Sequence, residues 1–323
     1  MIKVHCFVSC VCELLKKRGV DHRPYYFGVW DADFALDDSF ALAYHADGID
    51  HSFFKNWYEL LYGIRLHEWY EEQKTKEENI ETLDYLVENK GSGHHIMVML
   101  DLSLLPEREN KFHQKPFPHY VMLEKTNDPE EWFMFDPDFR WEGRIKKKRI
   151  LDAVRSPDVG GGFSFDGDQI HVPTAQTVEA YFHTCMKLDK NPLTEAVRSI
   201  VEAFMYGSEQ HRLSELGSSL KQLPVLAIRK YAYEHAFAYF WMALDFGEEV
   251  FEAWCDEIES LEKGYKIVHY RAMKLAKTKK EEDYQALCDQ LDKQDKLETA
   301  IKHGLHQYFT QWAQKQSQVE QIG

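Results

Sequence analysis

The sequence predicts an α+β fold in which a mixed domain is followed by an all-helical domain. Up to about residue 150, short helical patterns alternate with continuous or alternating apolar runs that are typical of strands. From about residue 177 onward, apolar residues recur at spacings of three and four, which is typical of helices. We place the boundary in the glycine-rich segment 159–173, which predicts one domain at 1–158 and a second at 159–323.

The composition narrows the class of protein. The chain has 323 residues, 44% of them hydrophobic, which suffices for the cores of about two domains. Its net charge of −15 argues against nucleic acid as a partner, because phosphates require a basic surface. The negative charge favours a cationic small molecule as a ligand. The alternative is that the acidic surface only keeps the protein soluble.

The location of the protein can also be predicted. No segment offers the roughly 18 apolar residues of a membrane span. The apolar start is followed, rather than preceded, by the charges of residues 16–18, which is the wrong order for a secretory signal. Six cysteines are too few for a disulfide scaffold. We therefore expect a soluble cytoplasmic protein with no membrane partner.

The first half predicts one clear helix and three strands. The helix begins near Cys6 and ends near Arg18, where Gly19 provides the stop. The strands are expected within 93–106, 119–128 and 131–145, and a loop is expected over 159–173. The second half predicts five helices, the last two forming a long antiparallel pair. Their ranges are 177–188, 192–206, 223–246, 248 to about 279, and about 282 to 315.

Cys6 is the first candidate for a chemical role. It lies at or just before the first turn of the predicted helix, where unpaired N–H groups and the helix dipole favour thiolate over thiol. Cys12 falls in the buried stripe of the same helix and is expected to be a small core residue. The alternative for Cys6 is another partly buried thiol without a role.

A metal site is the competing interpretation of the same segment. His5, Cys6, Cys10 and Cys12 lie close in sequence, but residues 6 and 12 point to different faces of a helix and cannot converge on one ion. We therefore expect no metal.

A nucleophilic thiol needs a base and a group that orients the base. Residues 118–138 predict a β-hairpin with His119 at its start and Asp136 at its end. If Lys125 pairs with Trp132, Asp136 lies on the same face as His119, one step along. Asp138 is the alternative acid under another register. Alternatively, the Asp-Pro-Asp run is turn chemistry alone and His119 is a cross-strand polar residue.

Several motifs resemble one papain-like family. The run HCFVSCVCELLKKRGVDHRPYYFGVWDADFAL (5–36), followed by HIMVMLDLSLLP, HYVMLEKTND and FMFDP, resembles the papain-like proteins named after the butirosin biosynthetic acyltransferase. The resemblance implies that Cys6 is the nucleophile, His119 the base and Asp136 its orienting acid. It further implies that the cysteine takes an acyl group from a carrier-protein thioester and passes it to an amine.

The whole chain, including its helical half, resembles condensing proteins of siderophore biosynthesis. That resemblance implies transfer of a 3,4-dihydroxybenzoyl group from an acyl or aryl carrier protein to spermidine or a citryl-spermidine intermediate. The phosphopantetheine would be carried by the partner protein, so no cofactor of the chain's own is expected. Papain-like proteases place a glutamine before the cysteine, and none precedes Cys6 here. The oxyanion is therefore expected on backbone N–H groups, with His5 or another residue assisting.

Two other classes of function stay open. A cysteine amidase or thioesterase could use the same three residues, and a degenerate papain-like domain with a helical arm could act as a scaffold. The sequence also leaves the oligomeric state open, with a homodimer among the alternatives.

Two charged segments are candidates for binding. Trp30, Asp31 and Asp33 follow the first helix, and we expect them to line the cleft for a polyamine, together with Asp37 and Asp38. The alternative is a solvated acidic loop.

The second charged segment is basic. The run RIKKKR at 144–149 is expected to dock an acidic carrier protein. The alternative is a solvated charged face. The residues concerned are Arg144, Lys146, Lys147, Lys148 and Arg149.

Overall fold

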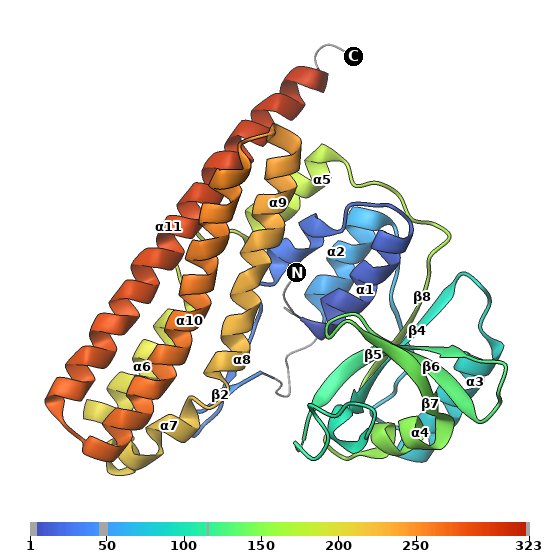
Figure 1. The fold of residues 1–323 in the computed structure, drawn as a ribbon, viewed down its shortest axis with the longest axis horizontal. Helices are drawn as coiled ribbons and strands as arrows, with labels where there is room; N and C mark the ends of the chain where they lie inside the picture. The colour runs from blue at the N-terminus through green and yellow to red at the C-terminus, as the bar shows by residue number, and fades with distance from the viewer. Residues whose placement is uncertain (1–4, 45–50, 115, 321–323) are drawn as a thin grey trace. The chain divides into compact units, whose positions relative to one another are not determined.

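Figure 1 shows the computed structural model, which describes residues 5–44, 51–114 and 116–320. These residues form two compact units. The sheet unit contains residues 5–25 and 52–173, and the helical unit contains the described residues of 26–51 and 174–323. The predicted α+β class with a helical C-terminal region is confirmed. No described helix is both long enough and apolar enough to cross a bilayer.

The sheet unit is built on one antiparallel sheet. Its described strands follow the order β3, β8, β4, β5, β6, β7, and every neighbouring pair is antiparallel. Successive hairpins therefore carry the chain from β4 to β7. The bounds are β3 (His67–Glu68), β4 (His94–Asp101), β5 (Pro118–Lys125), β6 (Glu131–Asp136), β7 (Trp141–Lys146) and β8 (Gly162–Asp166).

The structure corrects two predictions about the strands. The segment 131–145 is not one strand but the hairpin of β6 and β7, which turns where Arg140 adopts a φ of 50°. The segment 159–173 is not a loop throughout, because β8 lies between β3 and β4. At Gly162 a Cβ atom would stand 2.1 Å from the Trp69 ring, so this glycine allows close packing rather than flexibility.

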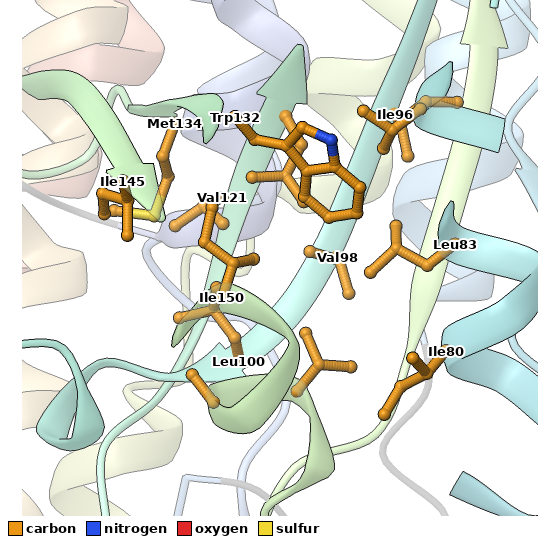
Figure 2. Close-up of a cluster of buried hydrophobic side chains, with 14 of the residues drawn as sticks. Ile80, Leu83, Ile96, Val98, Leu100, Val121, Trp132, Met134, Ile145 and Ile150 are labelled. Carbon is orange, nitrogen blue, oxygen red and sulfur yellow. The ribbon is translucent and has the colours of Figure 1, made fainter. Parts of the chain in front are cut away.

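One face of the sheet carries an apolar core. Alternate residues of the strands face the helices α3 (Lys76–Asn89) and α4 (Lys147–Arg155), and together they form one buried cluster. Figure 2 shows side chains of both helices and of the strands gathered in this core. The labelled residues are Ile80, Leu83, Ile96, Val98, Leu100, Val121, Trp132, Met134, Ile145 and Ile150.

The helix that begins at Cys6 packs on the sheet through aromatic contacts. Phe7 of α1 (Cys6–Lys17) meets the rings of Tyr120 and Phe163 with centroids 5.7 and 5.4 Å apart. The predicted stop is confirmed, since Gly19 has a φ of 70°. Beside α1 lies α2 (Ser52–Tyr62). These contacts fix the start of α1 relative to β5.

The helical unit is dominated by two long helices that run side by side (Figure 1). The predicted stripes of α10 (Glu248–Thr278) and α11 (Glu281–Glu320) are buried, which confirms the long pair. The single helix expected over 223–246 is instead α8 (Leu223–Ala227), a 3₁₀ turn and α9 (Ala232–Leu244). The other elements of this unit are β1 (Ala35–Leu36), β2 (Leu42–Ala43), α5 (Ala175–Cys185), α6 (Pro192–Tyr206) and α7 (Leu216–Ser219). The 3₁₀ segments of the chain are η1 (Arg23–Gly28), η2 (Leu102–Leu104), η3 (Gln210–Glu215) and η4 (Ile228–Tyr231).

A buried network of four charges lies within the helical unit. The two carboxylate oxygens of Asp31 accept from Lys230 at 2.9 Å and from Lys302 at 2.7 Å. Glu298 accepts from Lys230 at 2.6 Å, and the hydroxyls of Tyr233 and Tyr265 donate to its two oxygens at 3.0 Å each. Two cations and two anions balance each other. Burial raises the pKa of Asp31, but the two lysines outweigh it and hold that pKa below its usual value.

We predict that Lys302→Met will destabilise the helical unit by about 3 kcal/mol, because Asp31 and Glu298 then share one lysine in a buried site. Urea unfolding followed by helical circular dichroism measures the loss. Lys296→Met, an exposed change on the same helix, is the matched control and should cost less than about 0.5 kcal/mol. Equal midpoints for the two variants would contradict the importance of the network.

Candidate active site

Strands β5 and β6 bring His119 and Asp136 together. Lys125 pairs with Trp132 and Met122 with Phe135, so the register that we expected for this hairpin is confirmed. Asp136 is fully buried, and its Oδ1 lies 2.9 Å from His119 Nε2. The backbone N–H of Phe139 donates to the same oxygen at 3.1 Å. The imidazole is therefore held through one ring nitrogen by a buried carboxylate.

Cys6 stands at the first position of α1 and is almost completely buried. It lies close enough to His119 to help raise the pKa of that imidazole. Because Nε2 of His119 faces Asp136, Nδ1 is the ring nitrogen left for the thiol. The structure thus places a thiol, an imidazole and a carboxylate in series, although the three residues lie far apart in the sequence.

Arg108 is a member of this cluster that the sequence analysis missed. Its guanidinium is buried and forms an ion pair with Oδ2 of Asp136 at 2.7 Å. It also lies over the rings of Phe139 and Trp141, at 5.3 and 4.9 Å from their centroids. Arg108 belongs to the connection between β4 and β5. This connection has no helical or strand periodicity that would identify Arg108 as buried. Oδ1 of Asp136 therefore faces the His119 imidazole, and Oδ2 faces the Arg108 guanidinium.

The charges of the cluster shift the pKa values of His119 and Asp136. Burial alone would lower the pKa of His119, but the negative charges of Cys6 and Asp136, with hydrogen bonds to both, raise it to about 10. Burial would raise the pKa of Asp136, yet His119 and then Arg108 hold it below its usual value. A protonated imidazole beside the Asp136 carboxylate is therefore favoured at neutral pH.

The other residues near Cys6 have identifiable neighbours. His5, the N-cap residue of α1, is buried and lies against Phe54 with ring centroids 5.2 Å apart. Asp138, the alternative acid, accepts from the Ser9 hydroxyl at 2.9 Å, whereas the contact with His119 belongs to Asp136. Cys10 and Cys12 are buried in α1, and burial raises the pKa of Cys10 well above its usual value. Among the described residues, no cluster of three or more His, Cys, Asp or Glu could hold a metal ion.

The residues predicted to bind a polyamine lie in the helical unit. Of Trp30, Asp31 and Asp33, only Asp33 has an exposed side chain. Trp30 is buried and stacks on Tyr233 with centroids 4.8 Å apart. The carboxylate of Asp31 is occupied by Lys230 and Lys302, as described above. The side chain of Asp33 is exposed. The side chains of Trp30 and Asp31 are therefore buried, and the Asp31 carboxylate already has two lysine partners.

The basic segment 144–149 is less free than its sequence suggests. Lys146 pairs with Glu131 at 3.0 Å, Lys147 with Asp84 at 2.5 Å, and Arg149 with Glu107 at 2.5 Å. Within the described part of the chain, Arg144 and Lys148 form no ion pair, and both are exposed. The net attraction for an acidic partner thus depends mainly on these two residues.

We predict that Asp136→Asn will cost about 3 kcal/mol of unfolding free energy near pH 6 and less as the pH rises toward 10. The raised pKa of His119 means that its ion pair stabilises the fold fully below about pH 6.5, its unfolded value, and is lost through about pH 10. Urea unfolding at several pH values measures this difference. Asp138→Asn is the matched control, and its cost should not follow this pH profile. A pH-independent cost of Asp136→Asn would contradict the ion pair.

Comparisons with known proteins cover both units. The family model described as the DUF6005 N-terminal domain matches residues 1–170, and that of the DUF6005 C-terminal domain matches residues 176–322. Petrobactin synthase from Bacillus anthracis is 45% identical over 317 residues, which cover 98% of this chain and 97% of that protein. These matches span the thiol, the imidazole, the carboxylate and the helical unit alike. The chain belongs to the DUF6005 family.

Proposed function

We propose that this chain is an acyltransferase of siderophore biosynthesis that works through Cys6. The observation that carries the proposal is the series Cys6, His119 and Asp136 within one buried cluster. The similarity to petrobactin synthase supports a biosynthetic role in the petrobactin pathway. The resemblance of the motifs around Cys6, His119 and Asp136 to those of papain-like acyltransferases supports the proposed transfer chemistry. The substrates proposed are a 3,4-dihydroxybenzoyl thioester on a carrier protein and spermidine or a citryl-spermidine amine.

The first step forms an acyl-enzyme. The Cys6 thiolate attacks the carbonyl carbon of the thioester, and a bond forms between that carbon and Sγ. The bond from the same carbon to the phosphopantetheine sulfur then breaks, and the departing sulfur takes the proton held by His119. Asp136 keeps the imidazole oriented throughout. The energy of the thioester drives the step, so no further cofactor is required.

The second step transfers the acyl group to the amine. An uncharged amine nitrogen attacks the acyl carbon, the bond to Sγ of Cys6 breaks, and His119 takes the proton that the nitrogen loses. The product is an amide, and the starting thiolate and imidazolium are restored. The negative oxygen formed in each step requires donors. Among the described residues no side chain caps the start of α1, so backbone N–H groups of its first turn are proposed for this role.

We predict that Cys6→Ser will lower acyl transfer by about 10³-fold or more while the protein stays folded. Wild-type protein mixed with the dihydroxybenzoyl carrier thioester should gain one acyl group on the peptide that contains Cys6, as measured by mass spectrometry after acid quenching. Cys10→Ala is the matched control, because this thiol lies one turn along the same helix and burial raises its pKa. Acylation that persists in Cys6→Ser would contradict the proposal.

The same experiment separates the alternative functions. Added polyamine should discharge the acyl-enzyme to an amide much faster than water discharges it to the free acid. Discharge by water alone would identify a thioesterase or amidase. No adduct in the wild-type protein would indicate a scaffold.

Docking of the carrier protein is proposed for the exposed basic groups near β7 and α4. We predict that the double change Arg144→Glu and Lys148→Glu will slow acylation by the carrier-bound substrate about fivefold at low salt. The defect should shrink as salt screens the attraction in the wild type. Lys277→Glu with Lys296→Glu is the control of equal charge. A small thioester without the carrier should acylate all forms equally, and a defect with that substrate would contradict docking.

A further inference from the structure

The exposed face of α10, the helix beside α11 in Figure 1, is divided by charge. Its first half carries four carboxylates at spacings of three and four residues, so that they follow one face of the helix. They belong to Glu248, Glu252, Asp256 and Glu259, and all four residues are exposed. Within the described part of the chain, only Glu259 among them forms an ion pair, with Lys263 at 2.7 Å. The acidic half therefore keeps most of its charge.

The same face changes sign in the second half of α10. Lys263, Lys266 and Lys274 continue the row at helical spacing. Each lysine pairs with one carboxylate of the helical unit at 2.7 Å, and the side chains stay 55 to 59% exposed. The carboxylates are those of Glu259, Glu262 and Asp283. Since an ammonium group has three donors, each lysine can bind a second carboxylate from outside the unit.

The helix dipole does not explain this segregation of charge. The dipole favours acidic residues in the first turn of a helix and basic residues in the last, and its effect falls off within that turn. The acidic row runs from Glu248 to Glu259, about three turns of this 31-residue helix. The pattern along the middle of α10 therefore indicates a partner outside the helical unit.

Large apolar side chains are exposed among the lysines. Ile267, Tyr270 and Met273 are 44, 63 and 45% exposed. Tyr270 lies on the charged face between Lys266 and Lys274, and the helical spacing places Ile267 and Met273 on either side of it. Exposed apolar groups that gather in this way commonly mark an interface. The face thus offers apolar area as well as charge.

The order of the charges decides which partner fits. A partner with charge of only one sign would be attracted by one half of this face and repelled by the other. A fitting partner presents the two signs in the reverse order along about 40 Å, the length from Glu248 to Lys274. The same face of a second α10 does so when the two helices run antiparallel. A two-fold axis near Ser260 then places Asp256 opposite the partner's Lys266 and Glu259 opposite the partner's Lys263.

We propose that the exposed face of α10 from Glu248 to Lys274 pairs with the same face of a second copy of this chain, antiparallel about a two-fold axis near Ser260. Each contact occurs twice by symmetry. Glu248 meets the partner's Lys274, and Tyr270 packs beside the partner's Glu252, which covers part of its exposed ring. The interface uses the helical unit alone and does not depend on the proposed function.

Sedimentation velocity of the full-length protein at low salt tests the proposal. Asp256→Lys sets a lysine opposite the partner's Lys266 at both ends of the interface, and the dimer should weaken at least about tenfold. Lys266→Glu should weaken it by a similar factor. Glu257→Lys is the matched control, because it makes the same charge change one residue along, on another exposed face of α10. It should change the dissociation constant by less than about twofold.

An equal mixture of the Asp256→Lys and Lys266→Glu variants tests the antiparallel pairing itself. In the mixed dimer the introduced lysine of one variant meets the introduced glutamate of the other, and Lys266 of the first meets Asp256 of the second. The mixture should therefore recover dimers of wild-type affinity, which also shows that both variants are folded.

Three results would overturn the proposal. They are a wild type that stays monomeric at about 100 µM and low salt, a mixture that stays as weak as its components, and equal weakening by Glu257→Lys. Binding of an acidic carrier protein to the lysine half of a monomeric wild type, lost in Lys266→Glu, would assign the face to that partner and overturn the pairing as well.

Discussion

The buried series from Arg108 through Asp136 and His119 to Cys6 is the constraint on which the sheet unit depends. A carboxylate with no exposure to water is stable as an anion only when charged partners surround it. Arg108 and His119 provide those partners from two different segments, and Phe139 adds a backbone donor. These four groups meet only when three features of the fold are in place. They are the register of the β5–β6 hairpin, the course of the connection between β4 and β5, and the position of the start of α1.

The same series supports the nucleophilic role that we propose for Cys6 at the start of α1. Buried thiols are usually inert, as Cys10 illustrates, because burial disfavours the charged form. Cys6 differs in its surroundings, because it lies beside the His119 imidazole, whose pKa is raised by Cys6 and by Asp136. Arg108 prevents Asp136 from concentrating its whole charge on that imidazole. The ion pair with Arg108 thus balances the charge of Asp136 and helps to fix the position of that carboxylate.

Part of the candidate site could be predicted because it depends on residues that lie close together in the sequence. The pairing of Lys125 with Trp132 follows from the turn of one hairpin, and it places His119 and Asp136 together. Arg108 could not be predicted, since its partner lies 28 residues away and its loop has no pattern. The sequence around Asp31 predicts a charge on the surface. In the structure the Asp31 carboxylate binds Lys230 and Lys302, which lie about 200 and 270 residues later in the chain. Strand β8 could not be predicted, because its Gly162 serves close packing against Trp69, and sequence alone cannot distinguish such a glycine from one in a flexible loop.

The central claim is that His119 is held as a cation between Asp136 and Cys6. Nitrogen NMR of the His119 ring across a pH titration tests it most directly. Both ring nitrogens should stay protonated through neutral pH and titrate near pH 10, and the titration should move to lower pH in Cys6→Ala, where one of the two anions is gone. A titration near the ordinary histidine value of about 6.5, unchanged in Cys6→Ala, would contradict the account.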